Sequence, residues 1–91
     1  MNKNTTMLLK YIIKIIARNK RVGFRYFYGE YWISDSAELI AKNLNLTPKE
    51  VETILEKLVK QDYIKIGDGA MNENWYALTE KGLDYELSKE E

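Results

Sequence analysis

Residues 36–50, with the sequence SAELIAKNLNLTPKE, decide the fold that we expect for this chain. Ser36 is a strong helix-capping residue, and the apolar residues that follow it recur at helical spacing up to Leu44. Asn45 tolerates the left-handed backbone conformation that ends a helix and reverses the chain. We therefore predict a helix over residues 36–44 and a tight turn centred on Asn45.

A second helix is predicted over residues 48–61, because three signals at its start agree. Thr47 is a suitable N-cap, Pro48 is suited to the first helical position, and Glu50 lies three residues after the cap, where it completes a capping box. Its apolar positions follow at helical spacing. They are Val51, Ile54, Leu55 and Leu58.

Downstream of this helix pair, the pattern predicts a β-hairpin and then a short helix. Tyr63 to Ile66 and Trp75 to Leu78 have the composition of strands, and the polar, glycine-containing residues 67–74 are predicted to form the loop between them. Thr79 is placed to cap a final helix from Glu80 to about Ser88.

Upstream, we predict a helix from Asn4 to Asn19 and an extended segment from Val22 to Ile33. Gly29 and Glu30 divide the extended segment, and glycine at the first central position suits a hairpin turn. The apolar arc of the first helix covers about half of its circumference at about 100° per residue, which favours contact with several neighbours or a second subunit.

The predicted fold class is therefore α+β and mainly α, in one domain over residues 1–91, since a chain of this length is too short for two. An extended aromatic segment or hairpin precedes the second helix, and a helix ends the chain. We expect one core to join the elements. Its predicted members are Ile12, Ile16, Leu39, Leu44, Val51, Leu55, Leu58 and Ile64.

Composition argues against catalysis and against a bound cofactor or metal. The chain contains neither cysteine nor histidine, which are the usual nucleophiles, acid–base groups and metal ligands. Gly67 and Gly69 lie between strands rather than before a helix, so they do not form a phosphate-binding loop. The apolar run from Met7 to Ile16 is interrupted by Lys10 and falls short of the roughly 20 residues that span a membrane. We expect a cytoplasmic protein without a membrane segment.

Charge is distributed unevenly along the chain, although the net charge is zero. Seven basic residues precede the first acidic residue, Glu30, and the remainder has fourteen acidic and seven basic residues. If the fold keeps the early basic residues together, they form a surface for a polyanion. Alternatively, the two halves of the chain pair and neutralise each other.

Two segments resemble the winged helix-turn-helix superfamily, particularly small regulators of the MarR and PadR kind. They are Ile40-Ala-x-x-Leu-Asn-Leu-Thr47 at the predicted turn and Trp75-Tyr-Ala-Leu-Thr-Glu-Lys-Gly82 after the predicted loop. The resemblance covers roughly residues 4–88 and implies a winged helix-turn-helix fold and binding to double-stranded DNA. Asn45 stands where these families usually have glycine.

By this resemblance, the helix at residues 48–61 enters the major groove and the loop at residues 67–74 reaches adjacent backbone. The implied DNA-binding residues are Thr47, Lys49, Thr53, Lys57, Lys60, Asn72 and Asn74. The exposed face of the helix also carries Glu50, Glu52 and Glu56, which oppose attraction to phosphate. A protein-protein interaction module is therefore the alternative function.

The segment from Arg18 to Trp32 is a second candidate face for nucleic acid, because cations alternate there with aromatic rings. Its basic residues are Arg18, Lys20, Arg21 and Arg25. We expect most of the rings to pack in the core, with one or two left exposed. We also expect a homodimer through the terminal helices. The interface candidates are the apolar arc of the first helix and Leu83, Tyr85 and Leu87.

Overall fold

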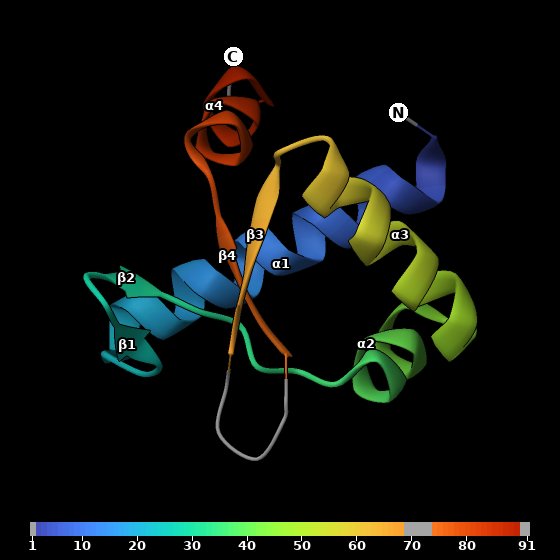
Figure 1. Cartoon of the computed structure of the whole chain (residues 1–91), viewed down its shortest axis with the longest axis horizontal. Coiled ribbons are helices and arrows are strands. Elements are labelled where there is room, and N and C mark those ends of the chain that lie inside the picture. The colour runs from blue at the N-terminus through green and yellow to red at the C-terminus, as the bar shows by residue number, and fades with distance from the viewer. Residues whose placement is uncertain (1, 69–73, 90–91) are drawn as a thin grey trace.

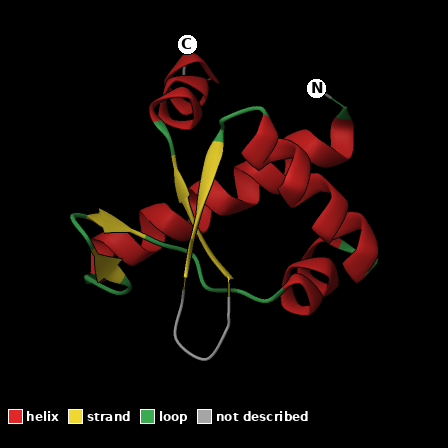
Figure 2. Cartoon of the chain, in the orientation of Figure 1, coloured by secondary structure: helices red, strands yellow, loops and turns green. Residues whose placement is uncertain are grey.

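The computed structural model describes residues 2–68 and 74–89 and has an α+β fold that is mainly helical (Figures 1 and 2). The elements in chain order are α1 (Lys3–Val22), β1 (Tyr26–Phe27), β2 (Glu30–Tyr31), α2 (Ala37–Leu44), α3 (Pro48–Lys60), β3 (Ile64–Asp68), β4 (Asn74–Leu78) and α4 (Glu80–Lys89). None of the helices in these residues is both long enough and apolar enough to cross a membrane.

The helix pair forms as its capping residues predict. The Ser36 side chain accepts a hydrogen bond from the Leu39 amide, and Asn45 ends α2 with φ 58° and ψ 44°. At the start of α3, the Thr47 hydroxyl accepts from the Glu50 amide, and the Glu50 carboxylate accepts from the Thr47 amide, both at 3.1 Å. The two helices and the turn between them are confirmed.

α1 is longer at its C-terminal end than predicted. Asn19 does not end the helix but is buried within it, and its side-chain amide donates to the Trp32 carbonyl at 2.8 Å. The helix continues to Val22 and ends at Gly23, which has the left-handed conformation. This buried hydrogen bond ties the end of α1 to the strand segment that precedes α2.

The β1–β2 hairpin is confirmed, but its turn lies one residue earlier than predicted. Phe27 pairs with Glu30, so Tyr28 and Gly29 are the two central residues, with φ 55° and 82°. Two positive φ values give the type I′ turn, whose twist suits a two-residue hairpin. Glu30 is therefore a strand residue.

The β3–β4 hairpin has a longer ladder than the predicted strands. Gly67 pairs with Trp75 and Asp68 pairs with Asn74, so these residues belong to strands and not to the predicted loop over residues 67–74. The absence of a side chain at Gly67 makes room for the Trp32 ring, because a Cβ there would lie 2.7 Å from that ring. One further bridge, between Ile33 and Tyr76, joins the segment before α2 to β4.

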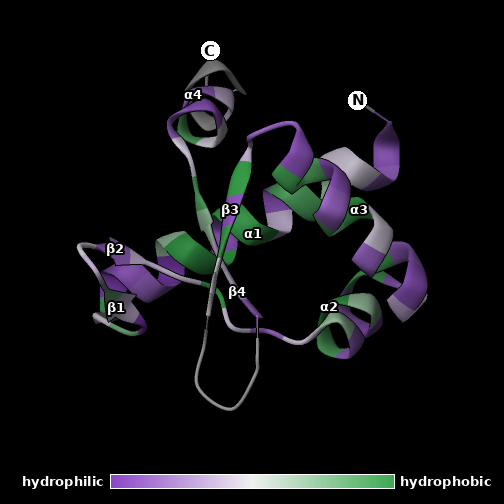
Figure 3. Ribbon diagram, in the orientation of Figure 1, coloured by the Kyte–Doolittle hydropathy of each residue, from purple (hydrophilic) through white to green (hydrophobic). Residues whose placement is uncertain are grey.

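The core lies where α1 and α3 meet the strands. Figure 3 shows hydrophobic residues concentrated in the middle of α1 and in β3. Of the predicted core residues, Ile12, Val51, Leu55, Leu58 and Ile64 are buried in one cluster, and Ile16 and Leu44 pack against it at partial burial.

Leu39 was wrongly assigned to this core. Its side chain is 44% exposed, whereas the neighbouring Ile40 is fully buried. α2 has apolar residues on more than one side, so periodicity alone does not fix which side of so short a helix faces inward.

α4 is fastened to the turn between α3 and β3. The Thr79 hydroxyl donates to the Asp62 carbonyl and accepts from the Gly82 amide, and the Lys81 ammonium donates to the Gln61 carbonyl at 2.8 Å. Gly82 is buried against the Tyr63 backbone. These contacts explain the Leu-Thr-x-x-Gly pattern that ends the Trp75–Gly82 segment. Its threonine and its glycine allow α4 to start in contact with the residues that precede β3.

Candidate nucleic-acid interface

The outward face of α3 carries the predicted DNA-binding residues. Lys49, Thr53, Lys57 and Lys60 are all exposed, and none of these lysines forms an ion pair with a described residue. The Thr53 hydroxyl donates to the Lys49 carbonyl at 3.0 Å. The Thr47 hydroxyl accepts from the Glu50 amide and keeps its own O–H donor, so Thr47 and the three lysines are the donors on this face without a hydrogen-bond acceptor among the described residues.

Acidic residues share this face and concentrate on the side nearest the β3–β4 hairpin. A hollow of about 220 Å³ lies there, and its lining includes Asp35, Glu38 and Glu52 together with Tyr76. Burial raises the pKa of the Tyr76 phenol above its ordinary value of 10.0, a hydrogen bond with Asn74 lowers it, and the charges of Glu52 and Glu56 raise it further. Negative potential therefore surrounds the space between α3 and β4.

The second part of the predicted interface is only partly described. Asn72 lies outside the described residues. Asn74 is exposed at the start of β4, where its side chain lowers the pKa of the Tyr76 phenol by hydrogen bonding. Asn74 thus lies on a strand that borders α3, not in the loop as predicted.

The second predicted group of basic residues lies elsewhere. Arg18, Lys20 and Arg21 lie on the last part of α1, and Arg25 follows just before β1. In Figure 1 the end of α1 and the β1–β2 hairpin lie on one side of β3 and β4, and α2 and α3 lie on the other. The structure therefore separates the predicted basic residues into two surfaces.

The outer side of α1 carries a basic stripe. At about 100° per residue, Lys3, Lys10, Lys14 and Arg21 fall within about 40° of one another and opposite the buried face of the helix. All four are exposed, and α1 contains no acidic residue. The helical spacing of these residues in the sequence is sufficient to predict the stripe.

Most rings of the Arg18–Trp32 segment do not pack in the core, contrary to expectation. Trp32 is buried and Tyr31 is half-buried, but Phe24, Tyr26 and Phe27 are each nearly half exposed, and Tyr28 is 93% exposed. The β1–β2 hairpin has only two residues in each strand and extends from the end of α1. Its rings therefore contact one another and β4 more than the central core.

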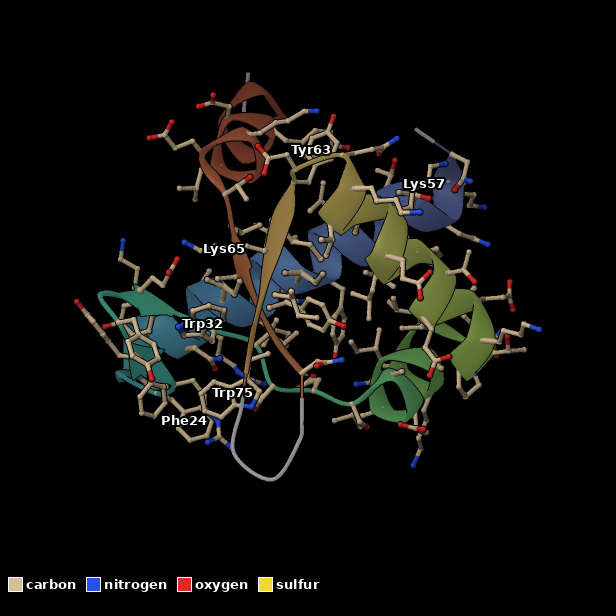
Figure 4. All side chains as sticks on the ribbon, in the orientation of Figure 1. Phe24, Trp32, Lys57, Tyr63, Lys65 and Trp75 are labelled. Atoms are coloured by element: carbon tan, nitrogen blue, oxygen red, sulfur yellow. The ribbon has the colours of Figure 1, made fainter. Side chains whose placement is uncertain are left out.

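Arg25 lies among these rings together with Trp75 of β4, which the sequence did not predict to join them, and we call Phe24, Arg25, Phe27 and Trp75 the Arg25 cluster. The Arg25 guanidinium carbon lies 4.6 Å from the centre of the Phe24 ring and 5.0 Å from that of Trp75. The Phe27 and Trp75 rings are 5.1 Å apart. Figure 4 shows Phe24 and Trp75 next to each other beside β1, with Trp32 nearby.

No group of three or more acidic side chains among the described residues is arranged to hold a metal ion. Comparison of the chain with family models, curated proteins and solved structures finds no match.

Proposed function

We propose that this chain is a winged helix-turn-helix domain that binds double-stranded DNA as a small transcriptional regulator. The observation that carries the proposal is the helix pair with its capped second helix, whose outward face presents three lysines beside an antiparallel hairpin, none of them in an ion pair with another described residue. The bridge from Ile33 to Tyr76 also holds the segment before α2 against that hairpin. A regulator acts where the DNA lies, so the proposal includes a cytoplasmic location.

In this proposal α3 lies in the major groove, and the residues that connect β3 and β4 lie over the adjacent backbone. Lys49, Lys57 and Lys60 neutralise phosphates and so supply most of the affinity. Glu52 and Glu56 oppose that attraction, which predicts weak non-specific binding. Glutamate can accept a hydrogen bond from cytosine N4, so the same residues can favour particular sequences.

Two triple variants with equal changes in charge test this placement. One replaces Lys49, Lys57 and Lys60 by Gln, and the control replaces Lys3, Lys10 and Lys14 of α1 by Gln. Affinity for a duplex is measured against salt by fluorescence anisotropy. The α3 variant should lower the slope of log affinity against log salt by about 2.7, because each phosphate contact contributes about 0.9.

The α1 control should change that slope by less than about 1, since it removes no contact in this placement. Replacing Glu52 and Glu56 by Gln should strengthen binding, because repulsion is removed. Equal losses in the two triple variants would contradict the placement of α3 in the groove. Failure of the unmodified chain to bind any duplex at about 50 mM salt would refute the DNA-binding proposal.

We also propose that the protein acts as a homodimer. Ile13, Ile15 and Ile16 of α1 are only partly buried, and Leu83 of α4 is 47% exposed. Tyr85 instead packs its ring edge against Tyr63, and the Leu87 side chain lies outside the described part of the chain. Sedimentation equilibrium at tens of micromolar should give twice the chain mass of 10.7 kDa, and a monomer would rule the dimer out.

A protein-binding module is the second candidate function, and the groove between α3 and the β3–β4 hairpin favours it. An apolar hollow of about 210 Å³ is lined by Leu55, Val59 and Tyr76 and by Ile66, which is 51% exposed. Glu56 and Lys60 also line it, and the neighbouring hollow adds Asp35, Glu38 and Glu52, so acidic residues outnumber basic ones and a basic amphipathic peptide is complementary in charge. A lysine- and leucine-rich peptide that binds the chain but not its Ile66→Glu variant, in the absence of duplex binding, would favour this function.

A further inference from the structure

We propose that the end of α1 and the β1–β2 hairpin form a separate site for single-stranded nucleic acid. This inference rests on the proposed nucleic-acid function and assigns a different ligand to a different surface. The site consists of the Arg25 cluster, the exposed ring of Tyr28, and the basic residues Lys20 and Arg21. The end of α1 and the β1–β2 hairpin lie together at one end of the molecule (Figure 1), and Phe24 and Trp75 lie next to each other there (Figure 4).

The first argument is that Arg25 contacts aromatic rings but pairs with no acidic residue among those described. Its guanidinium group lies against the rings of Phe24 and Trp75, its Nε is buried without a hydrogen-bond partner, and it forms no ion pair within the described part of the chain. Its backbone has φ 61°, a conformation that a non-glycine residue adopts at a cost. A planar cation fixed against aromatic rings is preorganised for phosphate, which it can bind through two parallel hydrogen bonds.

The second argument is the exposure of the neighbouring rings. Tyr28 is 93% exposed at the tip of the hairpin, and Tyr26 and Phe27 are each exposed over nearly half of their surface. The Tyr26 ring contacts Tyr31 edge to face, with centres 4.7 Å apart, which limits its movement. Unpaired bases stack on exposed rings of this kind, whereas the bases of a duplex are already stacked on one another.

The third argument is charge. Arg18, Lys20 and Arg21 are exposed on the last part of α1. The one acidic residue of the hairpin, Glu30, is paired with Lys65 of β3 at 2.7 Å and so does not cancel this charge. The surface combines positive charge with exposed rings, which matches the phosphates and bases of a single strand.

Binding of a fluorescein-labelled 15-nucleotide oligothymidine to the full chain tests the site by anisotropy at about 50 mM salt. Tyr28→Asn removes the most exposed ring, and asparagine tolerates the left-handed conformation at this position. The affinity should fall by about fivefold to about a hundredfold, the range expected for the loss of one stacked base. Tyr28→Phe retains the ring and should bind as the unmodified chain does.

A pair of variants with equal changes in charge separates this site from α3. Replacing Lys20 and Arg21 by Gln should lower the single-strand salt slope by about 1.4, because each contact with a single strand contributes about 0.7. Replacing Lys57 and Lys60 by Gln removes the same charge from α3 and should leave single-strand binding unchanged. Circular dichroism of each variant confirms that the helices are retained.

The outcomes distinguish this inference from the proposed function. Duplex binding without single-strand binding, or equal affinity of Tyr28→Asn and the unmodified chain for the oligonucleotide, overturns the single-strand site alone. Binding to neither nucleic acid overturns both proposals. If polyglutamate displaces the oligonucleotide as efficiently as unlabelled oligothymidine does, the surface recognises acidic protein, and the single-strand assignment is wrong.

Discussion

Replacing Gly82 by Ala should destabilise the protein, although the same change in an exposed helix usually stabilises by about 1 kcal/mol. A Cβ at residue 82 would lie 2.3 Å from the Tyr63 carbonyl oxygen and 3.0 Å from the Leu78 side chain. To reach an ordinary contact near 3.4 Å, α4 must move by about 1 Å away from β3. The same carbonyl accepts the Thr79 amide at 3.2 Å, so this movement also weakens the start of α4.

Overpacking of this kind costs about 1–3 kcal/mol, which exceeds or cancels the gain in helix propensity. We therefore expect a net loss of up to about 2 kcal/mol in the free energy of unfolding, measured by urea denaturation followed by circular dichroism. Asp84→Ala, at an exposed position of α4, is the control and should change the stability by less than about 0.5 kcal/mol. Stabilisation by Gly82→Ala would refute the contact between α4 and Tyr63.

Three further predictions concern the core, the turn and pH. Leu55→Ala should cost about 2–5 kcal/mol in urea denaturation, because it leaves a cavity between α3 and the strands; a loss below about 0.5 kcal/mol would contradict the packing of α3. Asn45→Gly should be neutral or stabilise by up to about 1 kcal/mol, whereas Asn45→Val should destabilise by about 1–2 kcal/mol, because the residue has positive φ. Burial and the Asp35 hydrogen bond raise the pKa of Tyr11, and burial above all raises that of Tyr76. Their stabilising effect is present below pH 10 and is lost as the pH rises through the folded-state values, so the Tyr11→Phe, Tyr76→Phe double variant should lose less stability above pH 10 than the unmodified chain.

The sequence predicted the parts of the fold that depend on neighbouring residues. The caps at Ser36 and Thr47 and the left-handed turn at Asn45 each involve groups only a few residues apart, so local chemistry determines them. The burial of Asn19 was not predictable in this way, because its partner is the carbonyl of Trp32, which only the folded chain brings near. The turn at Tyr28 was missed because tyrosine rarely adopts positive φ.

The sequence predicted which residues of the candidate sites are exposed, but not which of them the fold brings together. The exposed face of α3 followed from helical spacing, and all of its predicted lysines are on the surface. The separation of these lysines from Arg18 and Arg21 depends on the direction in which α1 runs through the domain. The contact of Arg25 with Trp75 depends on how the two hairpins pack against each other, and the sequence around either residue does not predict that packing.

The bridge between Ile33 and Tyr76 has a consequence for the order in which the domain assembles. Its two hydrogen bonds, of 2.9 and 3.0 Å, join residues 43 positions apart (76 − 33), and α2, α3 and β3 lie within the chain that they close. Closing a loop of that length is entropically costly until the enclosed helices and hairpin have shortened the path between its ends. The bridge therefore forms late, and its two amide protons exchange with solvent only when the segment at Ile33 separates from β4.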